Sequence, residues 1–299
     1  MRAPAARTPA AGAASCKPTV LVLCQACMGR LEKHAISSPE GDMPQTISDM
    51  KRTILRAAAQ AGEGHVPSAF SVLDILWVLY SQVLRHDPAN PGWQERDRFV
   101  LSKGHASLAL YAVLARQGYF PEAELDDFGA YGAMLGGHPC RLKVPGVECS
   151  AGSLGHGLPM AVGLALGLRL RGLPGRVFAL IGDGEANEGS VWEALLLAAH
   201  HKLTNLCVIV DVNHSTDRAL DLGDLPAKFT AFGLRAQCVD GHDHEALRQA
   251  LSHRPGDRPL ALLAQTVKGR GCRDMENNPA WHHRAPKEQE LRAMLRELA

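Results

Sequence analysis

The sequence predicts an α/β protein in which a mostly parallel sheet has helices on both faces. Short apolar stretches rich in β-branched residues alternate with helical stretches along the second half of the chain, which is typical of βαβ units. These apolar stretches are continuous, as expected of strands that are covered on both faces. Neither an internal repeat nor a low-complexity linker follows residue 47, so one domain is preferred over two.

Local signals justify the elements in chain order. A first helix stops at Gly62, Ser71 is expected to cap the next helix, and residues 119–147 are rich in Gly and Pro and predict an irregular segment. A nearly uncharged helix over residues 156–170 is expected to be packed on both sides. The predicted helices cover residues 50–61, 71–80, 106–115, 156–170, 190–200 and 244–251, and the predicted strands cover residues 99–101, 177–181, 206–212, 234–239 and 260–267.

The N-terminal segment, residues 1–46, differs from the rest of the chain. It is rich in Ala and Pro, and several basic residues precede its first acidic residue, Glu32. Such a leader is compatible with an organelle transit peptide. We favour a disordered extension, or a start codon placed too far upstream with Met43 or Met50 as the true start. The ordered domain is therefore predicted to cover residues 47–299.

Composition excludes several classes of protein. The chain of 299 residues is 46% hydrophobic and 21% charged, which is typical of a soluble globular protein. Its net charge of +1 predicts no global affinity for nucleic acid, and the absence of an uncharged apolar stretch of about 18 residues predicts no membrane span. The 8 scattered cysteines are expected to be reduced thiols of a cytoplasmic protein, with Cys24 and Cys27 more simply unpaired than half of a zinc or redox site.

Polar residues follow two successive predicted strands. Asp183 lies within Gly-Asp-Gly after the first, Asn213 ends Asp-Val-Asn after the second, and 213 − 183 gives a separation of 30 residues. A βαβ crossover needs about 30 residues, so both side chains are expected at the carboxyl ends of parallel strands, where α/β sheets bind ligands. Carboxylate and amide oxygens suit magnesium, and Gly184 allows a phosphate to approach the backbone. An isolated Asp-Gly is common in turns, so the combination carries this prediction.

The stretch from Gly182 to Gly189, followed by Asp211-Val212-Asn213, resembles the thiamine diphosphate motif of transketolase-like enzymes. Further motifs extend the resemblance in order from about Ile47 to Pro286: Gly64-His65, residues 97–105, Gly137-His138-Pro139, and residues 152–157, 240–243 and 266–269. The segment over residues 98–105 favours transketolase over deoxyxylulose-phosphate synthase or the 2-oxo acid dehydrogenases.

The resemblance implies a role for each matching residue. Magnesium is expected to bind Asp183, Asn213 and the backbone carbonyl of Ser215. The residues expected to bind thiamine diphosphate are His105, Gly152, Ser153, Leu154, Gly184, Glu188 and Asn213. Glu188 is expected, together with Glu193, to point toward a partner protomer.

The catalytic residues implied by the resemblance are histidines. His65, His138 and His282 are expected to face the sugar, where imidazoles can hydrogen-bond hydroxyls and move protons near neutral pH. His283 is a close second to His282, because the spacing to the following Ala-Pro differs from that in longer family members. The residues after Asn213 and after His65 also depart from the family pattern, which leaves the shape of both loops open.

The chain resembles only the first domain of a transketolase. It is therefore expected to be the N-terminal subunit of a two-component enzyme that transfers a two-carbon ketol unit from a ketose or ketose phosphate to an aldose. A C-terminal subunit with the pyrimidine-binding and C-terminal domains is the expected partner, in an α2β2 assembly. The alternatives are a subunit of another thiamine diphosphate enzyme, of the 2-oxo acid dehydrogenase type, and a non-catalytic cofactor-binding or scaffold protein.

Overall fold

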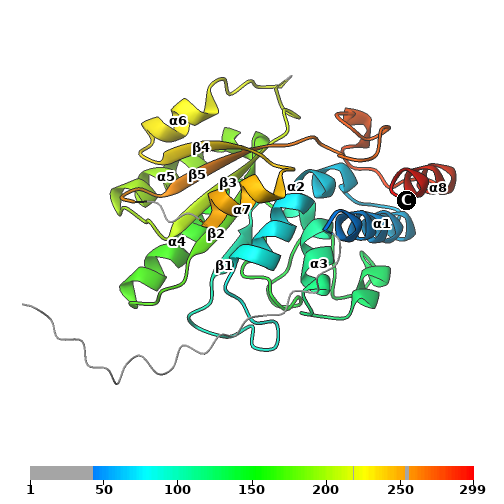
Figure 1. The fold of residues 1–299 in the computed structure, drawn as a ribbon, viewed down its shortest axis with the longest axis horizontal. Helices are drawn as coiled ribbons and strands as arrows, with labels where there is room; N and C mark the ends of the chain where they lie inside the picture. The colour runs from blue at the N-terminus through cyan, green and yellow to red at the C-terminus, as the bar shows by residue number, and fades with distance from the viewer. Residues whose placement is uncertain (1–42, 218, 253–255) are drawn as a thin grey trace, which may run out of the picture. The chain divides into compact units, whose positions relative to one another are not determined.

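The computed structural model describes residues 43–217, 219–252 and 256–299. The predictions made for residues 1–42, including those for Cys24 and Cys27, lie outside the described residues. All the helices and strands of the described residues belong to one compact unit (Figure 1).

The apolar stretches of the chain form strands that pair into one parallel sheet. Its strands are β1 (Arg98–Leu101), β2 (Val177–Gly182), β3 (Leu206–Val212), β4 (Arg235–Asp240) and β5 (Leu260–Gln265). In the described part of the chain their order is β1-β2-β3-β5-β4, and every neighbouring pair is parallel. All carboxyl ends therefore meet at one edge of the sheet, which we call the carboxyl edge.

Helices precede, connect and follow these strands. They are α1 (Met43–Ala61), α2 (Val66–Val78), α3 (Ser107–Arg116), α4 (Gly157–Leu170), α5 (Gly189–His200), α6 (Leu225–Ala231), α7 (His244–Ser252) and α8 (Glu288–Glu297). A π-helical turn, Leu79–Val83, extends α2, and 3₁₀ turns at Gly104–Ala106 and Gly184–Asn187 follow β1 and β2.

Helices cover both faces of the sheet, which confirms the predicted fold class (Figure 1). Successive strand residues point to opposite faces, so β1 divides its side chains between two apolar cores. Phe99 and Leu101 join the core formed with α1, α2, α3 and α7, and Val100 joins the core formed with α4, α5 and α6. The continuous apolar strands were thus a correct sign of a sheet that is buried on both sides.

The start of α2 corrects one prediction. The helix begins at Val66 with His65 at its N-cap and Pro67 in its first turn, a position that proline favours. Ser71 is therefore not a cap but a fully buried residue inside the helix, where its hydroxyl binds Asp211. The stretch Val66–Val83 is long and apolar enough to cross a membrane, and 83% of it is buried inside the protein, as in a core helix.

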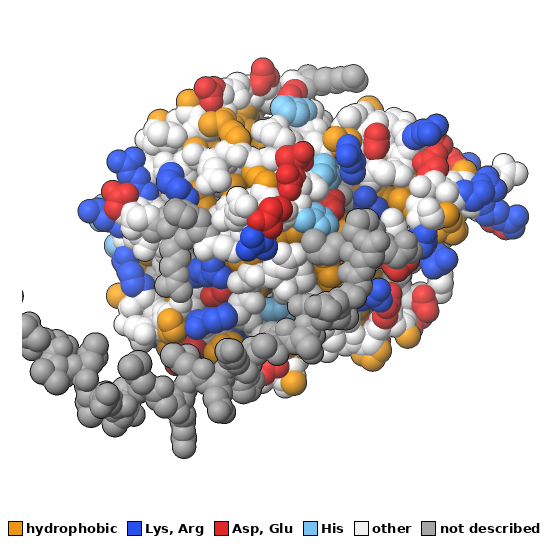
Figure 2. Space-filling model, viewed as in Figure 1, with side chains coloured by type: hydrophobic (Ala, Val, Ile, Leu, Met, Phe, Trp, Pro, Cys, Tyr) orange, Lys and Arg blue, Asp and Glu red, His pale blue; other side chains and the backbone are white. Residues whose placement is uncertain are grey.

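Two further predictions are corrected. Helix α4 is buried on one side only, because Met160 and Leu170 are exposed, as are Leu196 and Leu197 on the neighbouring α5. Strand β5 ends at Gln265 rather than at residue 267, because the chain then turns to bring Thr266 toward Asp211. Figure 2 shows acidic and basic side chains interspersed on the face in view, in keeping with the nearly balanced charge of the chain.

Candidate active site

Polar side chains gather where the strands end, at the carboxyl edge. Lys103 follows β1, Asp183 follows β2, Asn213 follows β3 and Lys268 follows β5. A cavity of about 310 Å³ opens there and is lined by Asn213, Lys268 and His282, among others. Open α/β sheets bind ligands at this edge because successive loops leave a crevice there. The two polar residues that the strand pattern placed together are therefore part of one site.

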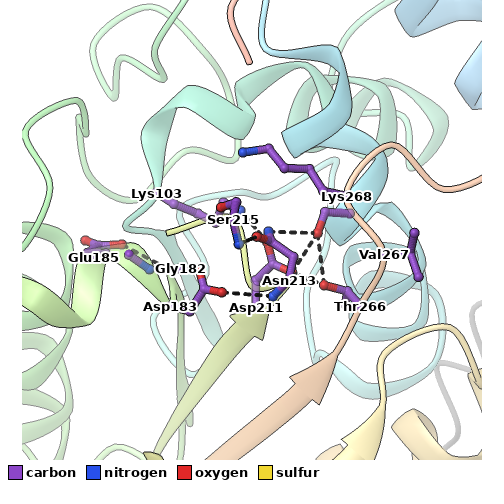
Figure 3. A network of polar contacts seen from close by, with 12 residues as sticks. Lys103, Gly182, Asp183, Glu185, Asp211, Asn213, Ser215, Thr266, Val267 and Lys268 are labelled. Atoms are coloured by element: carbon purple, nitrogen blue, oxygen red, sulfur yellow. Dashed lines mark hydrogen bonds and ion pairs between the residues drawn. The ribbon is translucent and has the colours of Figure 1, made fainter. Parts of the chain in front are cut away.

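Asp211 organises the polar network under this cavity (Figure 3). Its side chain is fully buried and accepts hydrogen bonds from Ser71 Oγ at 2.7 Å, from the ammonium of Lys103 and from the hydroxyl of Thr266. Burial works against the carboxylate, but the adjacent Lys103 and these hydrogen bonds together lower the pKa of Asp211. Asp211 therefore stays charged, and it connects β3 to helix α2, to the segment after β1 and to the residue after β5.

Asn213 receives its orientation from Asp211. Its Nδ2 donates to Asp211 at 2.8 Å and to Ser71 Oγ at 3.2 Å, so the amide nitrogen faces the buried network. The amide oxygen must then face the other way, where it accepts from the Ser215 amide at 3.1 Å. An amide oxygen has two lone pairs, so Asn213 can still bind a cation.

Asp183 lies against the same turn. Its carboxylate accepts from the amides of Gly184 at 2.7 Å, Asn213 at 3.0 Å and His214 at 2.7 Å. Burial, and then the neighbouring Asp211, raise the pKa of Asp183, so a cation at this place would favour its charged form. A carboxylate beside an outward amide oxygen is the donor chemistry that magnesium prefers, and the residues present fit that ion.

Gly184 has no room for a side chain. A Cβ at this position would overlap Thr216, which lies in the loop after Asn213. Ser215, the third predicted ligand residue, is exposed in the same loop. Glycine is therefore needed where the backbone of Gly184 comes close to that loop.

The loop of Gly152, Ser153 and Leu154 is fastened to the same edge by Glu185, which our sequence reasoning missed. Glu185 is buried and accepts from Ser102 Oγ, from the Gly155 amide at 2.9 Å and from the Gly182 amide at 3.3 Å. Burial raises its pKa. Gly152 and Ser153 are exposed, and Leu154 is half-buried.

Four imidazoles cluster beside the cavity. The ring of His65 lies 5.2 Å from that of His105, 5.4 Å from that of His282 and 4.4 Å from that of His283, on which it stacks. His282 and His283 thus both belong to the cluster. His138, a fifth predicted histidine, is exposed, and its ring lies 3.6 Å from where a Cβ of Gly152 would be.

Two members of the cluster, His65 and His105, are held neutral. Burial, and then the proximity of His283, lower the pKa of His65 to about 4, and burial with Lys103 lowers that of His105 to about 2. Both rings are therefore uncharged at pH 7, with one donor and one acceptor nitrogen each. Neutral imidazoles can bind sugar hydroxyls and take up a proton as charge develops.

Lys268 is the second residue that sequence reasoning left unassigned. Its Nζ lies 3.1 Å from Nδ1 of His282, and burial together with Lys103 lowers its pKa to about 8. Lys103, Asp211 and Lys268 share a signal that could have identified them, because each is a charged residue at the end of an apolar strand or directly after it. Glu188, by contrast, caps α5 in an exposed position, and Glu193 is exposed on the same helix.

The fold and this edge define a parallel α/β domain with a polar cavity where its strands end. The family model described as "Transketolase, thiamine diphosphate binding domain" matches residues 44–299. The chain belongs to this family, which confirms the resemblance found in the sequence motifs.

Two relatives of similar length match most of this chain. It is 36% identical over 270 residues to the 6-deoxy-6-sulfo-D-fructose transketolase subunit SqwG of Clostridium sp. (strain MSTE9), covering 88% of this chain and 98% of that protein. It is 41% identical over 254 residues to an apulose-4-phosphate transketolase subunit of Actinobacillus succinogenes, covering 83% of this chain and 92% of that protein.

Solved transketolases share the fold but are longer. The structure of transketolase from Campylobacter jejuni superposes with a TM-score of 0.79 at 29% identity, covering 85% of this chain and 42% of that one. The chain thus spans less than half the length of that transketolase.

Proposed function

We propose that this chain is the N-terminal subunit of a two-component transketolase. The enzyme transfers a two-carbon ketol unit from a ketose or ketose phosphate to an aldose, with thiamine diphosphate and magnesium as cofactors. The observation that carries the proposal is the carboxyl edge, where the Asp183 carboxylate binds the backbone amide of Asn213, and Asn213 lines the same cavity as His282 of the histidine cluster. Two relatives that match over nearly their whole length are named as transketolase subunits.

The residues of the carboxyl edge divide the binding of the cofactor among them. Thiamine diphosphate supplies the carbanion-stabilising chemistry that breaks and forms the carbon–carbon bond. Asp183, Asn213 and the backbone carbonyl of Ser215 would hold magnesium. The Gly184 backbone and His105 would contact the diphosphate, and the loop over residues 152–154 would line the thiamine.

Histidines of this chain handle the sugar. His65 and His282 lie within one cluster, and His138 lies beside Gly152. Because His65 is neutral at pH 7, it can donate a hydrogen bond to one hydroxyl and accept one from another. Lys268, next to His282, supplies a positive charge that stabilises anionic groups in the cavity.

The second subunit would complete the site from outside this chain. We propose a C-terminal subunit with the pyrimidine-binding and C-terminal domains, and two copies of each chain in a cytoplasmic α2β2 assembly. Apolar side chains left exposed on α4 and α5 support pairing between copies of this chain, since burying them against a like surface is favourable. Glu188 and Glu193 lie at the same surface of α5.

A donor-to-acceptor assay tests the proposal. The chain is assayed with magnesium and thiamine diphosphate, with and without the candidate partner, using ketose phosphate donors and aldose acceptors. We expect two-carbon transfer only when both chains are present. Transfer by this chain alone at the full rate would refute the two-component enzyme, and cofactor binding without transfer for any donor would favour a non-catalytic role.

A further inference from the structure

A stripe of polar groups runs along one face of α2, a helix whose 13 residues are all buried. It consists of the backbone carbonyl of Pro67 and the side chains of Ser71 and Asp74. Pro67, Ser71 and Asp74 are spaced four and three residues apart and therefore lie on one face of the helix. The Pro67 carbonyl accepts from the Gly269 amide at 3.0 Å, and Ser71 donates to Asp211. Two of the three residues of the stripe thus contact the ends of β3 and β5 directly.

The third residue, Asp74, reaches the same edge through a histidine. Its carboxylate is bound by Nδ1 of His242 at 2.9 Å and by Nε2 of His244 at 2.7 Å. On its other side, Nε2 of His242 accepts from the amide of Val267 at 2.9 Å. An amide can only donate, so the proton of His242 must be on Nδ1, where it points to Asp74.

Asp74 is suited to hold this tautomer. Burial opposes its charge, but hydrogen bonds from the two histidines, with Lys51 nearby, bring its pKa below the usual range. A carboxylate that receives the Nδ1 proton fixes both the ring orientation and the free lone pair of an imidazole, as it does for metal-bound histidines. Nε2 of His242 is thereby kept unprotonated and accepts the hydrogen bond from the Val267 backbone amide.

Val267 precedes Lys268, whose ammonium lies 3.1 Å from His282 in the cofactor cavity. We propose that Asp74 and His242 are positioning residues which hold the turn after β5, and with it Lys268 and His282, in the geometry that the cavity requires. The assignment of this cavity as the cofactor site rests on the proposed transketolase function. The hydrogen-bonded relay from Asp74 through His242 to Val267 is present in this chain whatever its function.

His244 offers a matched control. It binds the other oxygen of the same carboxylate, but it begins α7 and leads away from the turn after β5. Replacing His244 therefore disturbs Asp74 to a similar degree without removing the acceptor of the Val267 amide. A purely structural role of the Asp74 cluster would make the two histidines equivalent.

The first test measures hydrogen exchange of the Val267 amide by NMR in the full chain without cofactor. In His242→Asn the shorter amide can still reach Asp74 but not Val267, so we expect exchange about tenfold faster or more. In His242→Gln the longer amide oxygen can reach Val267 and restores part of the protection, and His244→Asn leaves exchange unchanged. Equal exchange in His242→Asn and His244→Asn overturns the proposal.

A second variant covers a failure of His242→Asn to fold. Asp74→Leu has a side chain of similar size but no acceptor for the Nδ1 proton of His242, so the Val267 amide is again expected to exchange faster. Unchanged exchange in this variant overturns the proposal.

The second test measures turnover with the partner chain, magnesium and thiamine diphosphate. We expect kcat to fall about tenfold in His242→Asn and to change less than about twofold in His244→Asn. Equal losses in both variants count against positioning. If the unmodified chain with its partner transfers no two-carbon unit, the proposed function fails. Exchange of the Val267 amide still shows whether the hydrogen bonds from Asp74 through His242 hold the turn after β5.

Discussion

A buried carboxylate paired with a cation occurs at each end of the sheet, and the two pairs differ in the groups that they position. At the carboxyl edge, Lys103 pairs with Asp211, and their side chains are 2% and 0% exposed. At the opposite edge, where β1 and β2 begin, Arg176 pairs with Asp97 at 2.8 Å. Asp97 also accepts from the amides of Arg85 at 3.1 Å and Arg176 at 2.8 Å, so it fastens the segments that lead into the two strands.

The pair at the carboxyl edge orients groups that remain available. Asp211 turns the amide oxygen of Asn213 away from the core, toward the loop beside the cavity that Lys268 lines. Cavity size does not show which edge holds the functional site, because a larger cavity of about 1030 Å³ lies at the opposite edge. There the Arg96 guanidinium is already paired with Glu148 at 2.7 Å. A buried ion pair indicates a functional site when it orients polar groups toward a cavity, whereas the pair at the opposite edge only joins segments of the chain.

Replacing a carboxylate at each edge is the strongest test of this difference. Asp183→Asn removes the proposed magnesium ligand, which we expect to lower two-carbon transfer by about 1,000-fold, or ~4 kcal/mol. Asp97→Asn should instead lower the free energy of unfolding and leave cofactor affinity unchanged. Turnover with the partner chain, calorimetric binding of magnesium thiamine diphosphate and urea unfolding measure the three quantities. The comparison breaks if Asp97→Asn impairs cofactor binding as much as Asp183→Asn does.

Removing the two cations sharpens the comparison of stability. Lys103→Met leaves the fully buried Asp211 without its counter-ion, which should cost about 3–5 kcal/mol of unfolding free energy. Arg176→Met should cost less, about 1–3 kcal/mol, because Asp97 keeps its two amide donors and Arg176 is 24% exposed. Urea denaturation of both variants decides the order, and a larger loss in Arg176→Met would contradict it.

Replacing one histidine at each edge is expected to have an effect of intermediate size. His282 contacts Lys268 in the cavity, whereas His86 is bound by the Tyr119 hydroxyl at 3.0 Å and the Tyr80 carbonyl at 2.8 Å. We expect His282→Ala to lower kcat about 100-fold, as the loss of a general acid or base does, with little change in stability. His86→Ala should show the reverse pattern in kinetics and thermal unfolding. Similar kcat values for the two variants would remove His282 from the active site.

The smallest effect concerns pH. Burial and Lys103 lower the pKa of Lys268 to about 8, so it loses its proton as the pH rises past 8, well before a free lysine does. A diphosphate binds the charged form, so affinity for magnesium thiamine diphosphate should fall by up to about tenfold between pH 8 and 9. Lys268→Arg stays charged over this range and should flatten the dependence. An equally steep loss in Lys268→Arg would assign the titration to another group.

Much of the fold was predictable because its signals are local. The apolar strands and the 30-residue spacing of Asp183 and Asn213 placed both residues at the carboxyl edge, where the structure has them. Ser71 was misjudged because a serine ahead of an apolar stretch resembles a cap, while the helix in fact begins at the preceding proline turn. The predicted burial of both sides of α4 is not met within this chain, where Met160 and Leu170 are exposed, and would require the proposed pairing between copies.

The side-chain partners of Asp211, Lys268 and Asp74 could not be inferred from the sequence. Asp74 meets His242 across 168 positions, and Lys103 meets Asp211 across 108. Contacts at such separations depend on how helices pack on the sheet, and local pattern does not encode them. The histidine cluster likewise unites His65 with His282 and His283, which lie at opposite ends of the described domain.

The sequence by itself determined the family, the parallel α/β architecture and the edge at which the polar residues gather, because strand period and motif order follow from neighbouring residues. The tertiary structure decided which of those residues face one another and which protons they keep. Burial in a shared, poorly solvated edge holds His65 and His105 neutral, while the ion pair with Lys103 and its hydrogen bonds keep Asp211 charged. Solvation and distance set these states, and both exist only once the chain has folded.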